Sequence, residues 1–212
     1  MKTDNDYLKY GSYENYVLYR MCFKHPEHTD IDIIASKIEL IGRAYSAAIE
    51  RKAGKKFKSG KNFCRDIVAP AIRNSEIDFW LKDVRDIKRL TEKNIGKSLR
   101  CHKHVTDLFK KITGLEKRSL ASKYLHFHAP NAFFIYDSIA NRNVKERIHA
   151  KKFCVPVDSR EFDNEYAVFS CRCLKYRDKV EKKLGGRIDR YETVEVWIWE
   201  SVTPLALGSL TR

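Results

Sequence analysis

The chain has few of the residues that interrupt helices: it holds five prolines and nine glycines among 212 residues. Long helices are therefore plausible. No apolar run approaches the ~20 residues that a membrane-spanning helix needs. The N-terminal residues Met-Lys-Thr-Asp-Asn-Asp lack the apolar stretch of a secretory signal. We expect a cytoplasmic, mostly helical protein without a membrane partner.

Signals for metals and cofactors are also scarce. The six cysteines are scattered without a Cys-x-x-Cys pair, so a zinc site or an iron–sulfur cluster lacks ligands and reduced thiols are expected. His102/His104 and His126/His128 are His-x-His pairs, whose side chains diverge on a helix. A Pro-Asp motif followed by Glu-x-Lys, typical of metal-dependent nucleases, is missing. We predict no metal and no cofactor.

Positive charge is in excess. Lys and Arg total 42 against 28 Asp and Glu, which gives a net charge of +14. Such an imbalance attracts polyanions and releases counterions on binding, so double-stranded DNA is the first candidate partner and a merely basic protein is the alternative. The segment Lys52–Lys61 is rich in lysine and glycine. It is predicted to be either a loop that binds phosphates or a solvated loop that binds nothing.

Apolar spacing and capping residues predict an all-α protein, which we expect to be a monomer. Asp30 is a good N-cap for a helix whose apolar stripe runs from Ile31 to Ile49. Further helices are predicted at 14–24, 63–74, 76–87, 92–112, 118–128, 136–148 and 163–184, with a connector at 155–162. A last helix at 189–201 contains an alternating pattern that would also suit a strand.

The most informative stretch is Gly114–Ser138. Within it Ser122, Lys123 and His126 are spaced so that they share one helix face, which either lines a cleft or is a solvated polar surface. Asp137 follows an apolar run. A carboxylate in that position can cap the next helix, and it can also stand at a pocket rim to stabilise a positively charged sugar. The two roles are compatible.

This arrangement resembles the helix-hairpin-helix superfamily of DNA glycosylases, in which a hairpin, a helix and a turn precede the catalytic Asp. The resemblance covers roughly residues 31–148, and its specific part is the phrase at 119–138. It implies a single compact protein with two helical lobes flanking a cleft, one formed by 30–136 and the other by 1–29 plus 137–212. Gly114 stands in the hairpin, where Glu116 or Lys117 occupies the place of the second glycine.

The resemblance also implies roles for individual residues. Asp137 matches the family's catalytic Asp, which stabilises charge developing at the sugar C1′. Lys123 is the candidate amine for members that also cleave the strand, with Lys117 as its rival. Water or lysine as nucleophile stays open. The candidates for contacting substrate and DNA are Ser122, His126, Tyr136, Arg43, Tyr45, Arg51, Lys117 and Arg118. Tyr45, Trp80 and Tyr136 are candidates for stacking on an extruded base.

The wider phrase Ala-Ser-Lys-Tyr-Leu-His-Phe, followed by Ile-Tyr-Asp-Ser, also resembles bacterial proteins related to phage-defence glycosylases. So does the segment Ile41–Arg51. The implied activity is cleavage of an N-glycosidic bond in DNA to leave an abasic site. A damaged base and a modified phage base such as glucosylated hydroxymethylcytosine both stay open as substrates. The alternatives are a non-catalytic DNA-binding protein, in which Asp137 is only a cap, and a nuclease.

Overall fold

The computed structural model describes residues 10–51, 62–149 and 160–186, and the regular elements in these ranges are all helical. The predicted all-α class is confirmed at that level. The elements are α1 (Tyr13–Lys24), α2 (Ile31–Ala44), the π-helical turn η2 (Cys64–Val68), α3 (Ala69–Arg73), α4 (Ile77–Arg85), α5 (Ile95–Thr113), α6 (Arg118–His128), α7 (Ser138–Arg147) and α8 (Asn164–Leu184). The segment Lys52–Lys61, most of the connector 155–162 and the predicted helix 189–201 lie outside the described residues.

Helix boundaries follow local capping chemistry. The Asp30 carboxylate accepts from the amides of Asp32 and Ile33 at 2.8 and 3.1 Å, which satisfies donors that the first turn of α2 leaves free. Gly114 ends α5 in the left-handed conformation, with φ at 77°. Asp30 is the signal from which the sequence predicts the start of α2.

The C-terminal end of α2 differs from the prediction. The apolar stripe predicts a helix as far as Ile49, but α2 ends at Ala44 and Ser46 adopts a positive φ of 51°. The chain then turns back so closely that a Cβ on Gly42 would lie 3.1 Å from the Cα of Ala48. Ile49 is fully buried from this loop rather than from a helix. Ile49 therefore reaches the core because the chain turns back after α2, and not because the helix continues to this residue.

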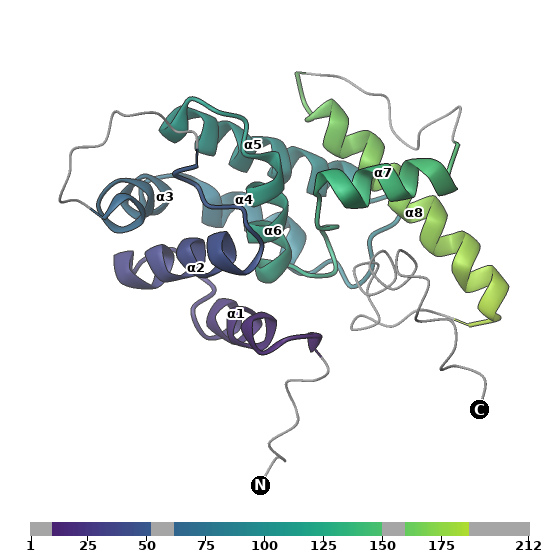
Figure 1. Ribbon diagram of the computed structural model, residues 1–212, viewed down its shortest axis with the longest axis horizontal. Helices are drawn as coiled ribbons and strands as arrows, with labels where there is room; N and C mark the ends of the chain where they lie inside the picture. Colours follow the sequence, from purple (N-terminus) through teal and green to yellow (C-terminus); the bar gives the residue numbers. More distant parts are fainter. Residues whose placement is uncertain (1–9, 52–61, 150–159, 187–212) are drawn as a thin grey trace, which may run out of the picture.

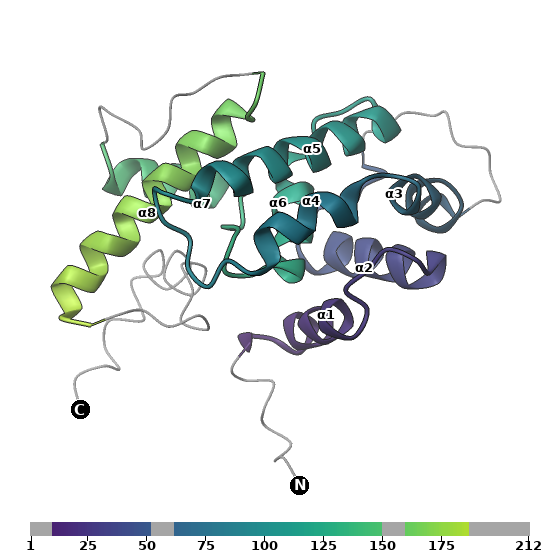
Figure 2. The same cartoon turned by 180° about the vertical axis from the view of Figure 1, so that it is seen from behind.

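Buried apolar side chains form two clusters joined by α5. The first cluster takes residues from α1, α2, η2, α3, α4, α6 and the later part of α5, whereas the second takes them from α7, α8 and the start of α5. Ile95 and Leu99 belong to the second cluster, and Val105 and Phe109 to the first. In both views α7 and α8 lie at one end of the molecule and α3 at the other (Figures 1 and 2).

The first helix lies in a different cluster from the one that the predicted division gives it. That division groups residues 1–29 with 137–212, but Leu18 and Cys22 of α1 are buried in the first cluster and α1 packs on α2 and α6. An apolar helix face indicates that the helix packs against the core, but it does not indicate which other helices it contacts. The sequence therefore could not assign α1 to its cluster. Among the described residues, no helix is long and apolar enough to cross a membrane.

Candidate functional site

The turn between α5 and α6 holds the hairpin-like part of the sequence. Gly114 reverses the chain, and its amide donates to the carbonyl of Lys110 at 2.7 Å. Glu116, in the place of the second hairpin glycine, forms ion pairs with Lys110 at 2.9 Å and with Arg118 at 3.6 Å. A carboxylate thus partly neutralises the cations beside this turn. Any phosphate bound here would have to compete with Glu116.

Asp137 is the N-cap of α7. Its Oδ1 accepts from the amide of Ala140 at 2.7 Å, and its backbone is extended, with φ at −148°. The side chain is half-buried. Within the described part of the chain, Oδ2 has no hydrogen bond or ion pair. The carboxylate therefore keeps one oxygen for a further partner.

The polar face of α6 is buried against the segment that leads to Asp137. Ser122, Lys123 and His126 are 0, 1 and 2% exposed, so this face is not a solvated surface, and the three side chains do not stand open to a cleft either. The Tyr136 amide donates to the Ser122 hydroxyl at 2.9 Å, and the Lys123 ammonium donates to the Tyr136 carbonyl at 2.9 Å. His126 Nδ1 donates to the carbonyl of Phe133 at 2.8 Å. Three side chains of one helix thus fix the backbone just before Asp137.

Two partners of these side chains were not foreseen from the sequence. The Tyr19 hydroxyl of α1 donates to His126 Nε2 at 2.6 Å, given that Nδ1 carries the proton. The Ser119 hydroxyl accepts from Lys123 at 2.8 Å, one helical turn away. The i,i+4 spacing of Ser119 and Lys123 was a usable signal. The contact with Tyr19 depends on tertiary packing, so local spacing contains no sign of it.

Tyr136 and Arg118 are bound to acidic residues at the start of α8. The Tyr136 hydroxyl donates to Glu165, and burial, followed by the influence of this carboxylate, raises the Tyr136 pKa to about 12. Arg118 donates to both oxygens of Asp163 at 2.7 Å and to Glu165 at 2.8 Å. These contacts join α6 to α8. They leave Arg118 less available for a phosphate than the sequence predicts, because its charge is matched within the protein.

The loop after α2 brings two more predicted residues near Lys123. The Lys123 ammonium lies 5.6 Å from the centre of the Tyr45 ring, and the Tyr45 hydroxyl donates to Asn15 at 2.6 Å. The Lys117 ammonium donates to the carbonyl of Arg51 at 2.6 Å, while Arg51 itself is exposed. Tyr45, Arg51 and Lys117 therefore connect this loop to α6.

Arg43 and Trp80 do not join this group. The Arg43 side chain is 83% exposed and borders a separate pocket beside α2. Trp80 stacks on His104 at a centroid distance of 4.8 Å and packs against the first cluster. This packing supports a structural role for Trp80, which leaves Tyr45 and Tyr136 of the three aromatic residues that the sequence offers for stacking on a base.

In the described ranges, no group of three or more His, Cys, Asp or Glu side chains is placed to hold a metal ion. Cys22, Cys64, Cys101 and Cys173 are free and buried. Cys171 is disulfide-bonded, contrary to the expectation of six reduced thiols.

Comparisons with protein-family models, curated proteins and solved structures find no significant match to this chain. Its function must therefore be argued from its own residues.

Proposed function

We propose that this protein is a DNA glycosylase, which cleaves the N-glycosidic bond of a modified or damaged base and leaves an abasic site. The observation that carries the proposal is the state of Asp137. Asp137 is half-buried at the start of α7 and follows a helix–turn–helix unit, and within the described ranges only one of its oxygens is engaged. A carboxylate with a spare oxygen can stabilise the oxocarbenium-like sugar and orient an attacking water.

The backbone before Asp137 supplies the rigidity that this role needs. A catalytic carboxylate must be held within a fraction of an ångström of its working position. Ser122 and Lys123 bind the amide and the carbonyl of Tyr136, the residue directly before Asp137. The position of Asp137 is thereby fixed by the hydrogen bonds from α6 to Tyr136 and by the cap that Asp137 itself forms at the start of α7.

The surroundings of Lys123 favour water as the nucleophile. Its ammonium is buried and donates to Ser119 and to the Tyr136 carbonyl. An amine must be deprotonated and free to reach C1′ before it can form a Schiff base. Lys123 is therefore assigned as a positioning residue. Borohydride should trap no covalent enzyme–DNA adduct, and a trapped adduct through Lys123 would reverse this assignment.

The partner is double-stranded DNA, and the target base leaves the stack to be cleaved. The net charge of +14 supports a polyanionic partner. For the base itself, the resemblance to phage-defence glycosylases favours a bulky modified base such as glucosylated hydroxymethylcytosine, with antiviral defence as the role. Duplexes with damaged bases are the comparison substrates, and cleavage of those alone would assign the enzyme to repair.

The decisive variant is Asp137→Asn, because asparagine caps helices as well as aspartate does while losing the charge. We expect abasic-site formation to fall by at least about a hundredfold, with DNA affinity nearly unchanged. Alkali cleavage measures the first quantity and fluorescence anisotropy the second. Asp30→Asn is the matched control, since Asp30 caps α2 in the same way. Equal activity of D137N and D30N would refute the catalytic role.

The second candidate is a non-catalytic DNA-binding protein. It is favoured by the N-cap that Asp137 forms at α7, because this structural role alone gives a reason for an aspartate at this position. This alternative predicts DNA binding without base release from any substrate, by the natural chain and by D137N alike.

A further inference from the structure

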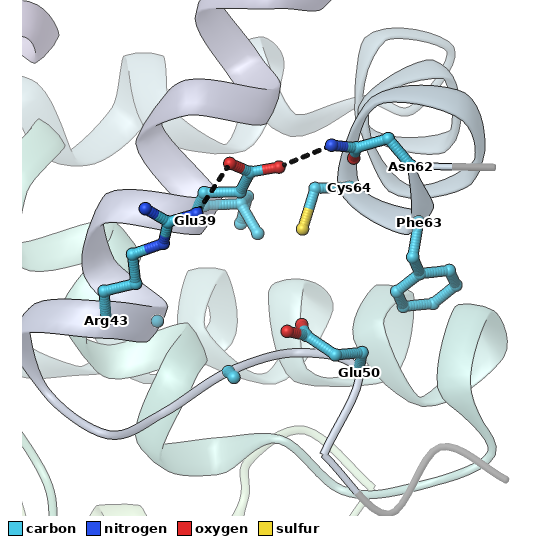
Figure 3. Close-up of a pocket in the computed structure, with 9 residues that line it drawn as sticks. Glu39, Arg43, Glu50, Asn62, Phe63 and Cys64 are labelled. Carbon is cyan, nitrogen blue, oxygen red and sulfur yellow. Dashed lines mark hydrogen bonds and ion pairs between the residues drawn. The ribbon is translucent and has the colours of Figure 1, made fainter. Parts of the chain in front are cut away.

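A pocket of about 200 Å³ opens between the second half of α2, the loop that follows it and the start of η2 (Figure 3). This is smaller than the roughly 300–1,000 Å³ of sites for drug-sized ligands, so it suits a molecule with few heavy atoms. The residues that bear on its chemistry are Ile38, Glu39, Arg43, Glu50, Phe63 and Cys64.

The polar walls of this pocket carry an excess of negative charge. Glu39 and Glu50 come from different elements and stand on different sides of it (Figure 3). The Asn62 amide donates to Glu39 Oε1 at 3.0 Å, whereas Arg43 approaches Glu39 Oε2 only to 3.9 Å and has a side chain that is 83% exposed. Within the described ranges, Glu50 forms no hydrogen bond or ion pair. Among the described residues that line the pocket, two carboxylates and one largely solvated guanidinium leave about one negative charge for a ligand to balance.

The thiol of Cys64 gives a second, independent indication of a ligand. Cys64 is only 5% exposed and its sulfur points into the pocket, on the side facing Glu50 (Figure 3). Cys64 is a free cysteine, and its thiol forms no hydrogen bond to any described residue. Burial, and then the Glu50 and Glu39 carboxylates, raise its pKa to about 12, so the thiol stays neutral. It begins the π-helical turn η2, a type of distortion that is frequent at functional sites.

The donor set favours an organic cation over a metal ion. In the described part of the chain these residues do not form a metal-binding group of three. The pocket instead combines carboxylates with the apolar side chains of Ile38 and Phe63. We propose that this pocket binds a small organic cation, an amidinium, guanidinium or alkylammonium group on a compact apolar body. Its N–H groups donate to Glu50 and Glu39, and its body lies against Phe63 and Cys64.

This proposal is independent of the glycosylase proposal and is tested without DNA. The probes are benzamidine, a flat cation, and benzamide, its neutral counterpart of nearly the same shape. Titration of the full chain with each compound is followed by calorimetry and by NMR. We expect benzamidine to bind with saturation and benzamide to bind at least about tenfold more weakly, because only the cation forms charge-assisted hydrogen bonds. Equal affinity for both compounds would overturn the proposal.

The variant Glu50→Gln separates the pocket from general charge effects. We expect it to weaken benzamidine binding at least about tenfold, because one charge-assisted hydrogen bond is lost. Glu92→Gln removes the same charge from an exposed position and should change the affinity by less than about twofold. Glu50 is exposed, so folding is expected to persist, and thermal unfolding checks this. An unchanged affinity of E50Q, or displacement of benzamidine by millimolar Mg²⁺, Ca²⁺ or Zn²⁺, would contradict an organic-cation site.

Discussion

At the residue scale, the structure depends on polar side chains that are buried with their partners. A buried polar group is costly when it lacks a hydrogen bond, and this cost is removed when it is paired. Ser122 is fully buried, and its hydroxyl accepts from the Tyr136 amide and donates to the Ser119 carbonyl, both at 2.9 Å. Ser98 is also buried, but its hydroxyl has no hydrogen-bond partner among the described residues. The two serines should therefore respond differently to the loss of the hydroxyl.

Ser122→Ala is expected to lower the free energy of unfolding by about 1–3 kcal/mol, because the Tyr136 amide is left buried without an acceptor. Ser98→Ala is the matched control and should be neutral or slightly stabilising, since it removes an unpaired hydroxyl. Urea denaturation measures both. If the two variants lose the same stability, the hydrogen bonds of Ser122 do not hold the segment before Asp137.

The sequence predicted that Ser122, Lys123 and His126 share one face of a helix, but not that this face is buried against the segment before Asp137. The helical wheel placed Ser122, Lys123 and His126 on one face, and this grouping follows from the helix alone. Their burial could not be predicted, because it depends on the carbonyls and amide of residues 133–136, which bind them from outside the helix. Asp137 was predicted as an N-cap and is one.

At the element scale, α5 connects the two clusters, and one of its histidines lies at the junction with α8. The ring of His102 stacks on Tyr166 at a centroid distance of 3.6 Å and an interplanar angle of 9°. His102 is fully buried, and this burial lowers its pKa to about 4. The folded protein thus keeps His102 neutral at a pH where the unfolded chain takes up a proton.

This pKa shift predicts a loss of stability in acid. Because the folded-state pKa lies below the unfolded value of 6.5, stability is complete above pH 6.5 and is lost as the pH falls toward 4. Burial also lowers the pKa of His28 and His128, which contribute in the same direction. His102→Phe should reduce the loss between pH 7 and 5 by roughly 2 kcal/mol, as measured by urea denaturation at each pH. The same pH slope in both proteins would argue against a neutral buried His102.

Most helix boundaries could be predicted from the sequence, and the end of α2 is the main exception. Arg118–His128 was predicted with the bounds that α6 has. The end of α2 was missed because Ile49 is buried although it lies beyond the helix, in the loop that turns at Ser46. Its apolar side chain therefore looked like a continuation of the helical pattern. The pocket beside Cys64 follows from that turn and from η2, so periodicity alone gave no indication of it.

At the scale of the whole molecule, the net charge of +14 is what would draw the protein to DNA in the proposed function. A protein that neutralises phosphates releases counterions, and its affinity then falls steeply with salt. Part of the positive charge is internally matched, as for Arg118. Arg51 is exposed beside the α5–α6 turn, where its carbonyl anchors Lys117, and it is a better candidate for a phosphate contact.

DNA affinity is expected to fall linearly with the logarithm of salt concentration, and Arg51→Gln should reduce the magnitude of this slope by about 1. Arg73→Gln, which removes an exposed charge at the end of α3, is the control and should leave the slope unchanged. Anisotropy titrations of a labelled duplex between low and moderate salt give both slopes. A salt-independent affinity would argue against DNA as the partner.

The most direct test of the glycosylase proposal is the release of free base under conditions that exclude metal-dependent cleavage. The full chain is incubated in EDTA with phage DNA that contains glucosylated hydroxymethylcytosine and, separately, with duplexes that carry damaged bases. Released bases are then identified by mass spectrometry. We expect free base from at least one substrate, matched by abasic sites that alkali cleaves. Absence of free base from every substrate, or strand breaks that EDTA abolishes, would contradict it.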